Sequence, residues 1–108
     1  MKMIKAVVRP EKSADILLCL SQHGFPAATR ANVLGRGKEQ GLKIDTVHYD
    51  ELAKDALTIV VEDTDVQKVV DLIIESAKVK KSGSYGDGKI FVSPVDTVYT
   101  ISSGKEEL

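Results

Sequence analysis

The sequence predicts an α+β fold of the split β-α-β, ferredoxin-like kind: an antiparallel four-stranded sheet with two helices on one face and a long loop between strands 2 and 3. Apolar extended segments and helical segments follow one another in the order β-α-β twice, in two halves of similar length. A clean amphipathic repeat marks the second helix. We expect residues 1–108 to form one domain. Its uncovered sheet face predicts a closed homo-oligomer.

The first half of the chain predicts a strand, a helix and a second strand. The apolar run 3–8 becomes β-branched toward its end and is expected to form the first strand. A helix is expected over 13–23, where Cys19 would pack as a buried thiol. His23 would then contact the last carbonyl groups of this helix. The second strand, 27–34, is predicted to be only half buried.

The second half begins with a buried central strand over 57–62, whose first five residues form a continuous apolar and β-branched run. Thr64 and Gln67 have the spacing of a capping box, so the second helix is expected to begin there. Its apolar positions recur at steps of three and one: Val66, Val69, Val70, Ile73, Ile74 and Ala77.

Positive charge is expected to complement the dipole at the end of this helix, from Lys78, Lys80 and Lys81. The remainder predicts a strand over 89–92, an extended segment over 97–101 and a polar C-terminal tail over 102–108.

Three glycines and an acid lead into a lysine within the segment 83–92, which reads Gly-Ser-Tyr-Gly-Asp-Gly-Lys-Ile-Phe-Val. Glycine permits positive φ and a close backbone approach to a ligand. Inward-facing N–H groups can bind an anion, and the lysine can supply a charge for a phosphate. The alternative is an ordinary tight turn before a strand, because Gly-Asp-Gly is also turn chemistry.

The segment 35–54 lacks a consistent apolar face, and its first part is polar and rich in glycine. A long loop in a small domain is usually functional or disordered, so we expect the flexible loop 36–54 to be the working end of the molecule. A metal site of His48, Asp50 and Glu51 is one alternative, although these residues are also common together in solvated loops.

Composition excludes several classes of partner. Lys plus Arg, 15, nearly balances Asp plus Glu, 16, so the net charge is -1. This balance predicts no nucleic-acid binding. Apolar runs stay short of the roughly 18 residues of a membrane span, so no membrane insertion is expected. With one cysteine and no signal-peptide core, a cytoplasmic location is expected.

The order of elements, Gly35-x-Gly37 before the long loop, Lys54 before the third strand and the run Gly86-Asp87-Gly88-Lys89-Ile90-Phe91-Val92 together resemble the nitrogen-regulatory PII signal-transduction proteins. The resemblance extends through the Gly-Lys-Glu-Glu ending at 104–107. It implies a trimer that binds ATP or ADP in clefts between subunits and senses 2-oxoglutarate beside Mg²⁺-ATP. It also implies a regulator that engages targets through the long loop, and not an enzyme.

The loop is short for this family, and its segment 47–54 is similar to the nitrogenase-associated branch. The resemblance then implies the short-loop first member of a pair of PII-like chains, acting as a homotrimer or as a mixed oligomer with the second chain. Its target would be the molybdenum-iron protein of nitrogenase. Tyr49 would be a contact residue and not a modification site.

Three sets of site residues follow from the resemblance, and none of them is catalytic. Nucleotide binding falls to Thr29, Gly35, Arg36, Gly37, Lys38, Lys54, Gly86, Asp87, Gly88 and Lys89. An effector or metal site would use Glu39, Gln40 and Gly41. Target contact would come from Lys43, His48, Tyr49, Asp50 and Glu51.

The sequence departs from the family pattern at three functional positions. Two arginines that reach phosphates across the subunit boundary are matched by Thr100 and Ser102. Each loss should weaken a triphosphate site by roughly 1.5 to 3 kcal/mol, which Lys105 could offset in part. The metal-chelating glutamine is matched by Glu39, which can bind Mg²⁺ but would repel 2-oxoglutarate.

Other functions remain open on the sequence. A transporter or glutamine synthetase could be the target in place of nitrogenase. A ligand-deficient structural subunit of a mixed assembly is favoured by Thr100 and Ser102 and opposed by Lys89 with its complete glycine loop. A phosphotransferase or phosphatase would need a nucleophile beside an orienting base. His23 and His48 have no such partner nearby in the sequence.

Overall fold

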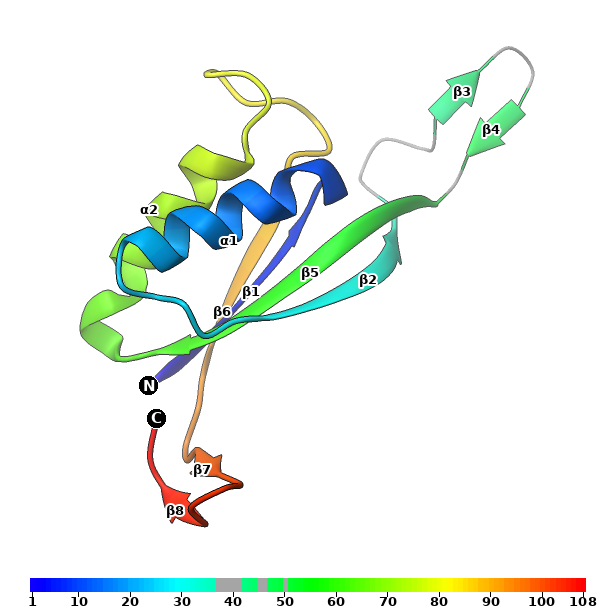
Figure 1. Cartoon of the computed structure of the whole chain (residues 1–108). Coiled ribbons are helices and arrows are strands. Elements are labelled where there is room, and N and C mark those ends of the chain that lie inside the picture. Colours follow the sequence, from blue (N-terminus) through cyan, green and yellow to red (C-terminus); the bar gives the residue numbers. More distant parts are fainter. Residues whose placement is uncertain (37–41, 45–46, 50) are drawn as a thin grey trace.

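The computed structural model describes residues 1–36, 42–44, 47–49 and 51–108. Two helices and eight strands are described along the chain (Figure 1). In order they are β1 (Lys2–Val8), η1 (Pro10–Lys12), α1 (Ser13–Gln22), β2 (Thr29–Gly35), β3 (Leu42–Ile44), β4 (Val47–Tyr49), β5 (Leu52–Val61), η2 (Asp63–Asp65), α2 (Val66–Ala77), β6 (Gly88–Pro94), β7 (Tyr99–Thr100) and β8 (Lys105–Glu106).

The main sheet has four antiparallel strands in the order β2-β5-β1-β6. The rows of paired residues continue across β5, β1 and β6, so that Ile4 lies opposite both Ile59 and Val92. Both helices lie on the same side of this sheet (Figure 1). The ferredoxin-like arrangement predicted from the sequence is therefore confirmed.

The core lies between the sheet and the two helices. Because side chains alternate across a strand, every second residue of β1 and β5 faces the helices. These residues, together with one face of each helix, form the buried cluster Ile4, Ala6, Val8, Ile16, Leu20, Leu57, Ile59, Val61, Val69, Ile73 and Ala77. Among the described residues, no helix is long and apolar enough to cross a membrane.

A buried polar pair fixes the start of α1 against β5. The hydroxyl of Ser13, which is fully buried, donates to Oδ2 of Asp55 at 2.5 Å, and Asp55 is itself 6% exposed. A buried carboxylate is costly unless its oxygens accept hydrogen bonds. The pair therefore fixes the start of α1 against β5 at the residue that follows Lys54.

The other face of the sheet is left without a covering layer. The alternate residues of β6 and β2 point to it, and Phe91 is 53% exposed while Val33 is 36% exposed. An apolar surface of this kind is typical of an assembly interface.

The sequence predicts a long loop between β2 and β5, but part of this segment forms paired strands. Strands β3 and β4 pair antiparallel as a small hairpin, with Lys43 opposite His48. Strand β5 begins at Leu52, so Lys54 belongs to the sheet and not to the loop. The hairpin projects from the ends of β2 and β5 (Figure 1). The two strands alternate apolar and polar residues, but each has only three residues, so the alternation is too short to predict a strand.

Local predictions at the helices had mixed outcomes. Helix α2 ends at Ala77 with Lys78 as its C-cap residue, so positive charge does lie at its C-terminal end. The capping box of Thr64 and Gln67 does not form, because the 3₁₀ turn η2 precedes α2 and no side chain caps the helix. Cys19 is half-buried and not a core thiol.

Other predictions at the ends of elements fared differently. His23 does contact the end of α1, because its Nδ1 lies 2.7 Å from the carbonyl oxygen of Cys19. The expected polar tail is partly ordered, since Tyr99–Thr100 pairs with Lys105–Glu106 as a second hairpin. That turn is closed by Gly104, whose φ is +68°.

Gly88→Ala is predicted to lower the free energy of unfolding more than a substitution at a glycine with open surroundings. Gly88 has φ +118°, and a Cβ there would lie 1.9 Å from the carbonyl oxygen of Val7. Backbone strain of about 1 to 2 kcal/mol and a steric cost of about 1 to 3 kcal/mol should add in the free energy of unfolding, measured in urea. Gly24→Ala is the matched control, since its φ is +92° and its surroundings are open. Equal losses in the two variants would contradict this packing.

Candidate functional site

Asp87 organises the glycine loop between α2 and β6. Its Oδ2 accepts the N–H of Ser84 at 2.7 Å, and its Oδ1 accepts the N–H of Val79 at 3.4 Å. The Asp87 N–H donates in turn to the carbonyl oxygen of Ser84 at 3.2 Å. The carboxylate thus ties both arms of the loop to its own position. This is a structural role within the loop that the resemblance assigns to nucleotide binding.

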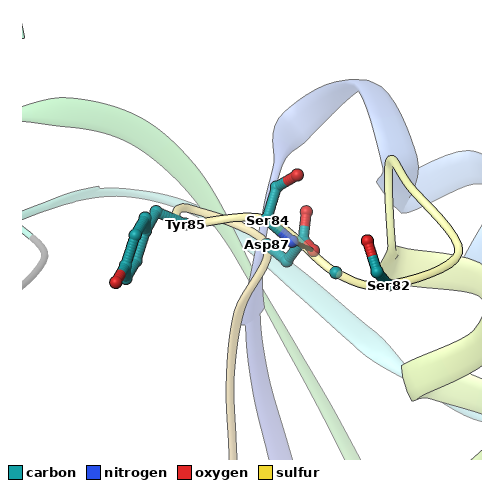
Figure 2. A pocket seen from close by; sticks show the side chains of 5 residues that line it. Ser82, Ser84, Tyr85 and Asp87 are labelled. Atoms are coloured by element: carbon teal, nitrogen blue, oxygen red, sulfur yellow. Dashed lines mark hydrogen bonds between the residues drawn. The ribbon is translucent and has the colours of Figure 1, made fainter.

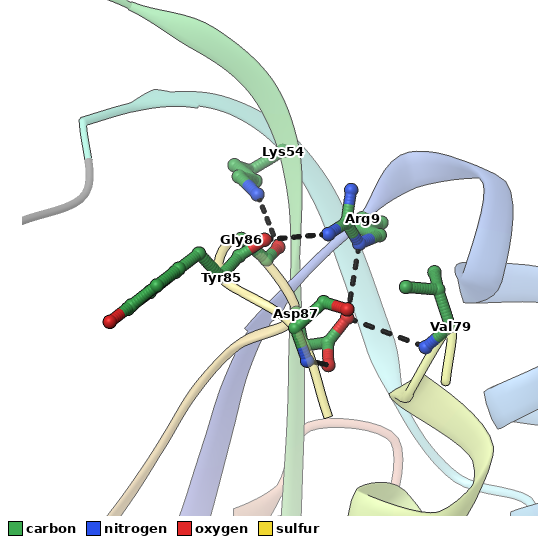
Figure 3. Close-up of polar contacts among 7 residues, drawn as sticks. Arg9, Lys54, Val79, Tyr85, Gly86 and Asp87 are labelled. Carbon is green, nitrogen blue, oxygen red and sulfur yellow. Dashed lines mark hydrogen bonds and ion pairs between the residues drawn. The ribbon is translucent and has the colours of Figure 1, made fainter. Parts of the chain in front are cut away.

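Arg9, at the end of β1, holds the loop from the other side. Its Nε donates to Oδ1 of Asp87 at 3.2 Å, and its Nη2 donates to the carbonyl oxygen of Tyr85 at 2.8 Å (Figure 3). The pair is partly buried, with 24% of the Arg9 side chain and 16% of the Asp87 side chain exposed. Such pairs are stronger than fully exposed ones, because water screens them less.

Lys54 links the root of the β3–β4 hairpin, the first residues of β5 (52–54), to the same loop. Its Nζ donates to the carbonyl oxygen of Gly86 at 2.7 Å (Figure 3). Burial and then the neighbouring Arg9 guanidinium lower the pKa of Lys54, although Glu11 and Asp87 act in the opposite direction. An anion bound beside Lys54 would favour its charged form.

The pKa of Asp87 reflects its contacts. Burial is the largest single influence and raises the pKa, but the hydrogen bonds from Ser84, Arg9 and Val79 and the charge of Arg9 together outweigh it, so the pKa lies below its usual value. The folded loop therefore stabilises the ionised form of the Asp87 carboxylate.

The strand register explains why these three side chains meet. Val8 lies opposite both Asp55 and Gly88. Continuing the antiparallel ladder by one residue places Arg9 between Lys54 and Asp87. Lys89, opposite Val7, projects with Lys54 to the uncovered face of the sheet, because both lie on the alternate set of positions.

A shallow pocket of about 630 Å³ borders the loop and is lined by Ser82, Gly83, Ser84, Tyr85 and Asp87 (Figure 2). The Tyr85 ring is 84% exposed and extends away from the two serines and Asp87. A second, more apolar groove of about 430 Å³ lies between α2 and β6 and includes Ile74 and Lys89. Hydroxyl groups, backbone and nearby cations make this end of the sheet suitable for an anion.

The structure brings together most of the described residues that the sequence analysis assigned to nucleotide binding. Gly35 packs against Lys54, since a Cβ on Gly35 would lie 3.4 Å from its Cγ. Lys54 reaches Gly86 directly. Asp87, Gly88 and Lys89 follow at the start of β6, and Arg36 is exposed just after β2.

Thr29 is not part of this cluster within one chain. It pairs with Thr58 at the opposite end of β2 from Gly35. Six residues of strand, at about 3.3 Å per residue, separate the two ends. Thr29 can approach a glycine loop only if that loop belongs to a second copy.

Several predicted residues lie outside the described ones: Gly37, Lys38, Glu39, Gln40, Gly41 and Asp50. The backbones of Lys43, His48 and Tyr49 belong to the β3–β4 hairpin, and Glu51 is exposed directly before β5. These residues are therefore placed on the projecting segment, with no further detail of their side chains.

Arg9 is the site residue that the sequence analysis missed. Its role depends on strand register, because Arg9 and Asp87 are 78 positions apart in the sequence. A prediction of which residues lie opposite each other across β5, β1 and β6 would have found it.

Comparisons with known proteins agree with this architecture. The family model described as nitrogen regulatory protein P-II matches residues 1–105. The nitrogen fixation nifHD region GlnB-like protein 1 of Methanothermobacter marburgensis is 47% identical over 108 residues, covering 100% of both chains. The protein of that name in Methanococcus maripaludis strain S2 is 52% identical over 101 residues, covering 94% of this chain and 93% of the relative.

The nifHD region glnB-like protein 2 of Methanococcus maripaludis is also similar, with 39% identity over 120 residues and coverage of 97% of this chain and 95% of the relative. Fold and site define a ferredoxin-like α+β protein with a glycine loop and a projecting hairpin at the same end of its sheet. The chain belongs to the nitrogen regulatory protein P-II family, because that family's model matches nearly all of it.

Asp87→Asn is predicted to destabilise the chain by about 1 to 3 kcal/mol at pH 7, because a charged acceptor of several hydrogen bonds is lost. A carboxyl whose pKa is lowered by folding stabilises above its usual pKa, 3.8 here, and that contribution disappears as pH falls through the lower folded value. The difference between wild type and variant should therefore shrink below about pH 4. Urea unfolding across pH measures this.

The exposed Asp96→Asn variant is the matched control for removing a carboxylate. A difference between wild type and Asp87→Asn that stays constant down to pH 2 would contradict the assigned role of Asp87.

Proposed function

We propose that this P-II family chain is a nitrogen-status regulator that binds ATP or ADP at its glycine loop and inhibits nitrogenase through its projecting loop. The observation that carries the proposal is the contact of Lys54 with Gly86 at 2.7 Å. It joins the root of the β3–β4 hairpin to the glycine loop. Occupancy of the loop and the position of the hairpin can influence each other through this contact.

The charges at this end of the sheet support a polyphosphate ligand. Arg9, Lys54 and Lys89 contribute three positive charges, and Asp87 neutralises one through its ion pair with Arg9. Glycine backbone can approach phosphate oxygens closely, and lysine supplies point charges to them. Lys54 is already partly desolvated, which strengthens its attraction to an anion.

Assembly is the second part of the proposal. Thr29 lies at the far end of β2, so it can line a base pocket only for a neighbouring copy. The uncovered sheet face offers the surface for such contacts. We therefore propose a homotrimer, or a mixed oligomer with a second PII-like chain, with nucleotide sites between subunits.

The effector site rests on residues outside the described ranges. We propose that Glu39, Gln40 and Gly41 lie near Mg²⁺ and 2-oxoglutarate when these ligands join the nucleotide. A carboxylate oxygen of Glu39 suits Mg²⁺, while the ammonium of Lys54 suits a carboxylate of the effector.

The target is proposed from the relatives and from the hairpin. The similar proteins are named for nitrogen fixation nifHD regions. The hairpin that carries Lys43, His48 and Tyr49 projects from the sheet, where it can reach a partner (Figure 1). Glu51 is exposed at its base. A transporter or glutamine synthetase is the alternative target.

Calorimetric titration with Mg²⁺-ATP and with ADP tests nucleotide binding. Lys89→Ala should weaken ATP binding by roughly 10- to 150-fold, which corresponds to the loss of one charged hydrogen bond of about 1.5 to 3 kcal/mol. Lys68→Ala is the matched control, because Lys68 lies over the Phe25 ring at the other end of α2 from the loop. No binding by the wild-type chain, alone or with a second PII-like chain, would overturn the nucleotide site.

Affinity capture tests the target. The wild-type chain should retain the molybdenum-iron protein of nitrogenase, and addition of ATP with 2-oxoglutarate should release it. Tyr49→Ala should reduce capture at least about tenfold if the tyrosine is a contact anchor worth about 1.4 kcal/mol or more. Capture of a transporter or glutamine synthetase in place of nitrogenase would overturn the target assignment.

A further inference from the structure

We propose that Arg9 is a positioning residue of the phosphate site, which aims the N–H of Gly86 at the polyphosphate by holding the carbonyl oxygen of Tyr85. This inference rests on the proposed function, since it concerns how the same loop receives its ligand. Arg9 does not itself need to touch the nucleotide.

The geometry of the peptide bond carries the first step. The carbonyl of Tyr85 and the N–H of Gly86 belong to one planar trans peptide, and they point in opposite directions. Arg9 Nη2 holds that carbonyl oxygen at 2.8 Å. The N–H of Gly86 is therefore directed away from the guanidinium, and its direction is fixed as long as the Arg9 contact persists.

The guanidinium reaches this position because residue 86 has no side chain. A Cβ on Gly86 would lie 3.2 Å from Arg9 Nη2 and 3.5 Å from Cζ, and the φ of Gly86 is +90°. Glycine thus serves two purposes at this position. It adopts the left-handed backbone conformation, and it lets the planar cation lie against the loop.

A fork-shaped donor is needed for this role. Arg9 contacts the side chain of Asp87 through Nε and the backbone of Tyr85 through Nη2, so one rigid plane joins two points of the loop (Figure 3). A lysine offers a single ammonium on a flexible stem and cannot fix both. In the Arg9→Lys variant the loop should therefore no longer be held in this conformation, even though the positive charge is kept.

Lys54 holds the next peptide in the same manner. Its Nζ donates to the carbonyl oxygen of Gly86 at 2.7 Å. Two cations consequently hold the carbonyls of two successive residues, Tyr85 and Gly86. The N–H of Gly86 points away from the Arg9 guanidinium and is the donor that a phosphate oxygen would meet, because phosphate oxygens need donors and not acceptors.

Hydrogen exchange of the ligand-free chain tests the positioning directly. In Arg9→Gln and in Arg9→Lys, the amides of Ser84 and Asp87, which bond within the loop, should exchange at least about tenfold faster than in wild type. Arg30→Gln is the matched control, because it removes an exposed arginine of β2. Unchanged protection of the loop amides in both Arg9 variants would overturn the inference, whatever the chain binds.

Calorimetry with ligands that differ in phosphate then separates positioning from a general loss of structure. Arg9→Gln and Arg9→Lys should weaken ATP and inorganic tripolyphosphate by tenfold or more and leave adenosine affinity within about twofold. Equal weakening of adenosine, or full rescue by lysine, would show that Arg9 acts through overall structure or charge alone and would contradict the inference. If wild type binds none of these ligands while exchange responds as expected, the proposed function fails, but the finding that Arg9 fixes the conformation of the loop stands.

Discussion

The carboxylate of Asp87 is the group on which the glycine loop depends. It accepts N–H groups from both arms of the loop and pairs with Arg9, whose own place is fixed by the end of β1. A loop with positive φ at Gly83, Gly86 and Gly88 has a large conformational entropy when unconstrained. The ion pair and its hydrogen bonds oppose that entropy and leave one loop conformation favoured.

This constraint links the loop to the rest of the molecule through strand register. The rows that bring Val8 opposite Asp55 and Gly88 also bring Arg9, Lys54 and Asp87 to one end of the sheet. Lys54 follows the hairpin by only a few residues, so a ligand that competes for its ammonium acts at the hairpin's root. The proposed regulation needs nothing beyond this short connection: one lysine exchanging a carbonyl oxygen for an anion.

Much of the fold could be predicted from the sequence because its core follows simple periodicities. The repeat of Val69, Ile73 and Ala77 and the run in β5 identify elements without knowledge of their partners. The β3–β4 hairpin was not found that way, because each of its strands has only three residues, too few for the alternation of apolar and polar positions to stand out. The sequence predicts Lys54 and Asp87 as site residues, but it does not predict the contacts of Asp87 within the loop or the part of Arg9. Their contacts depend on which residues face each other across three strands, and only the tertiary structure supplies that information.

Backbone amide chemical shifts followed during a titration with Mg²⁺-ATP test the central claim most directly, namely that the loop held by Asp87 is a phosphate site coupled to the hairpin. The account predicts that the largest changes occur at Gly86, Gly88 and Lys89 and that further changes reach β5 at Lys54 and the hairpin at 42–44 and 47–49. Changes confined to α1 and the first residues of α2, with the loop amides unmoved at saturation, would contradict it.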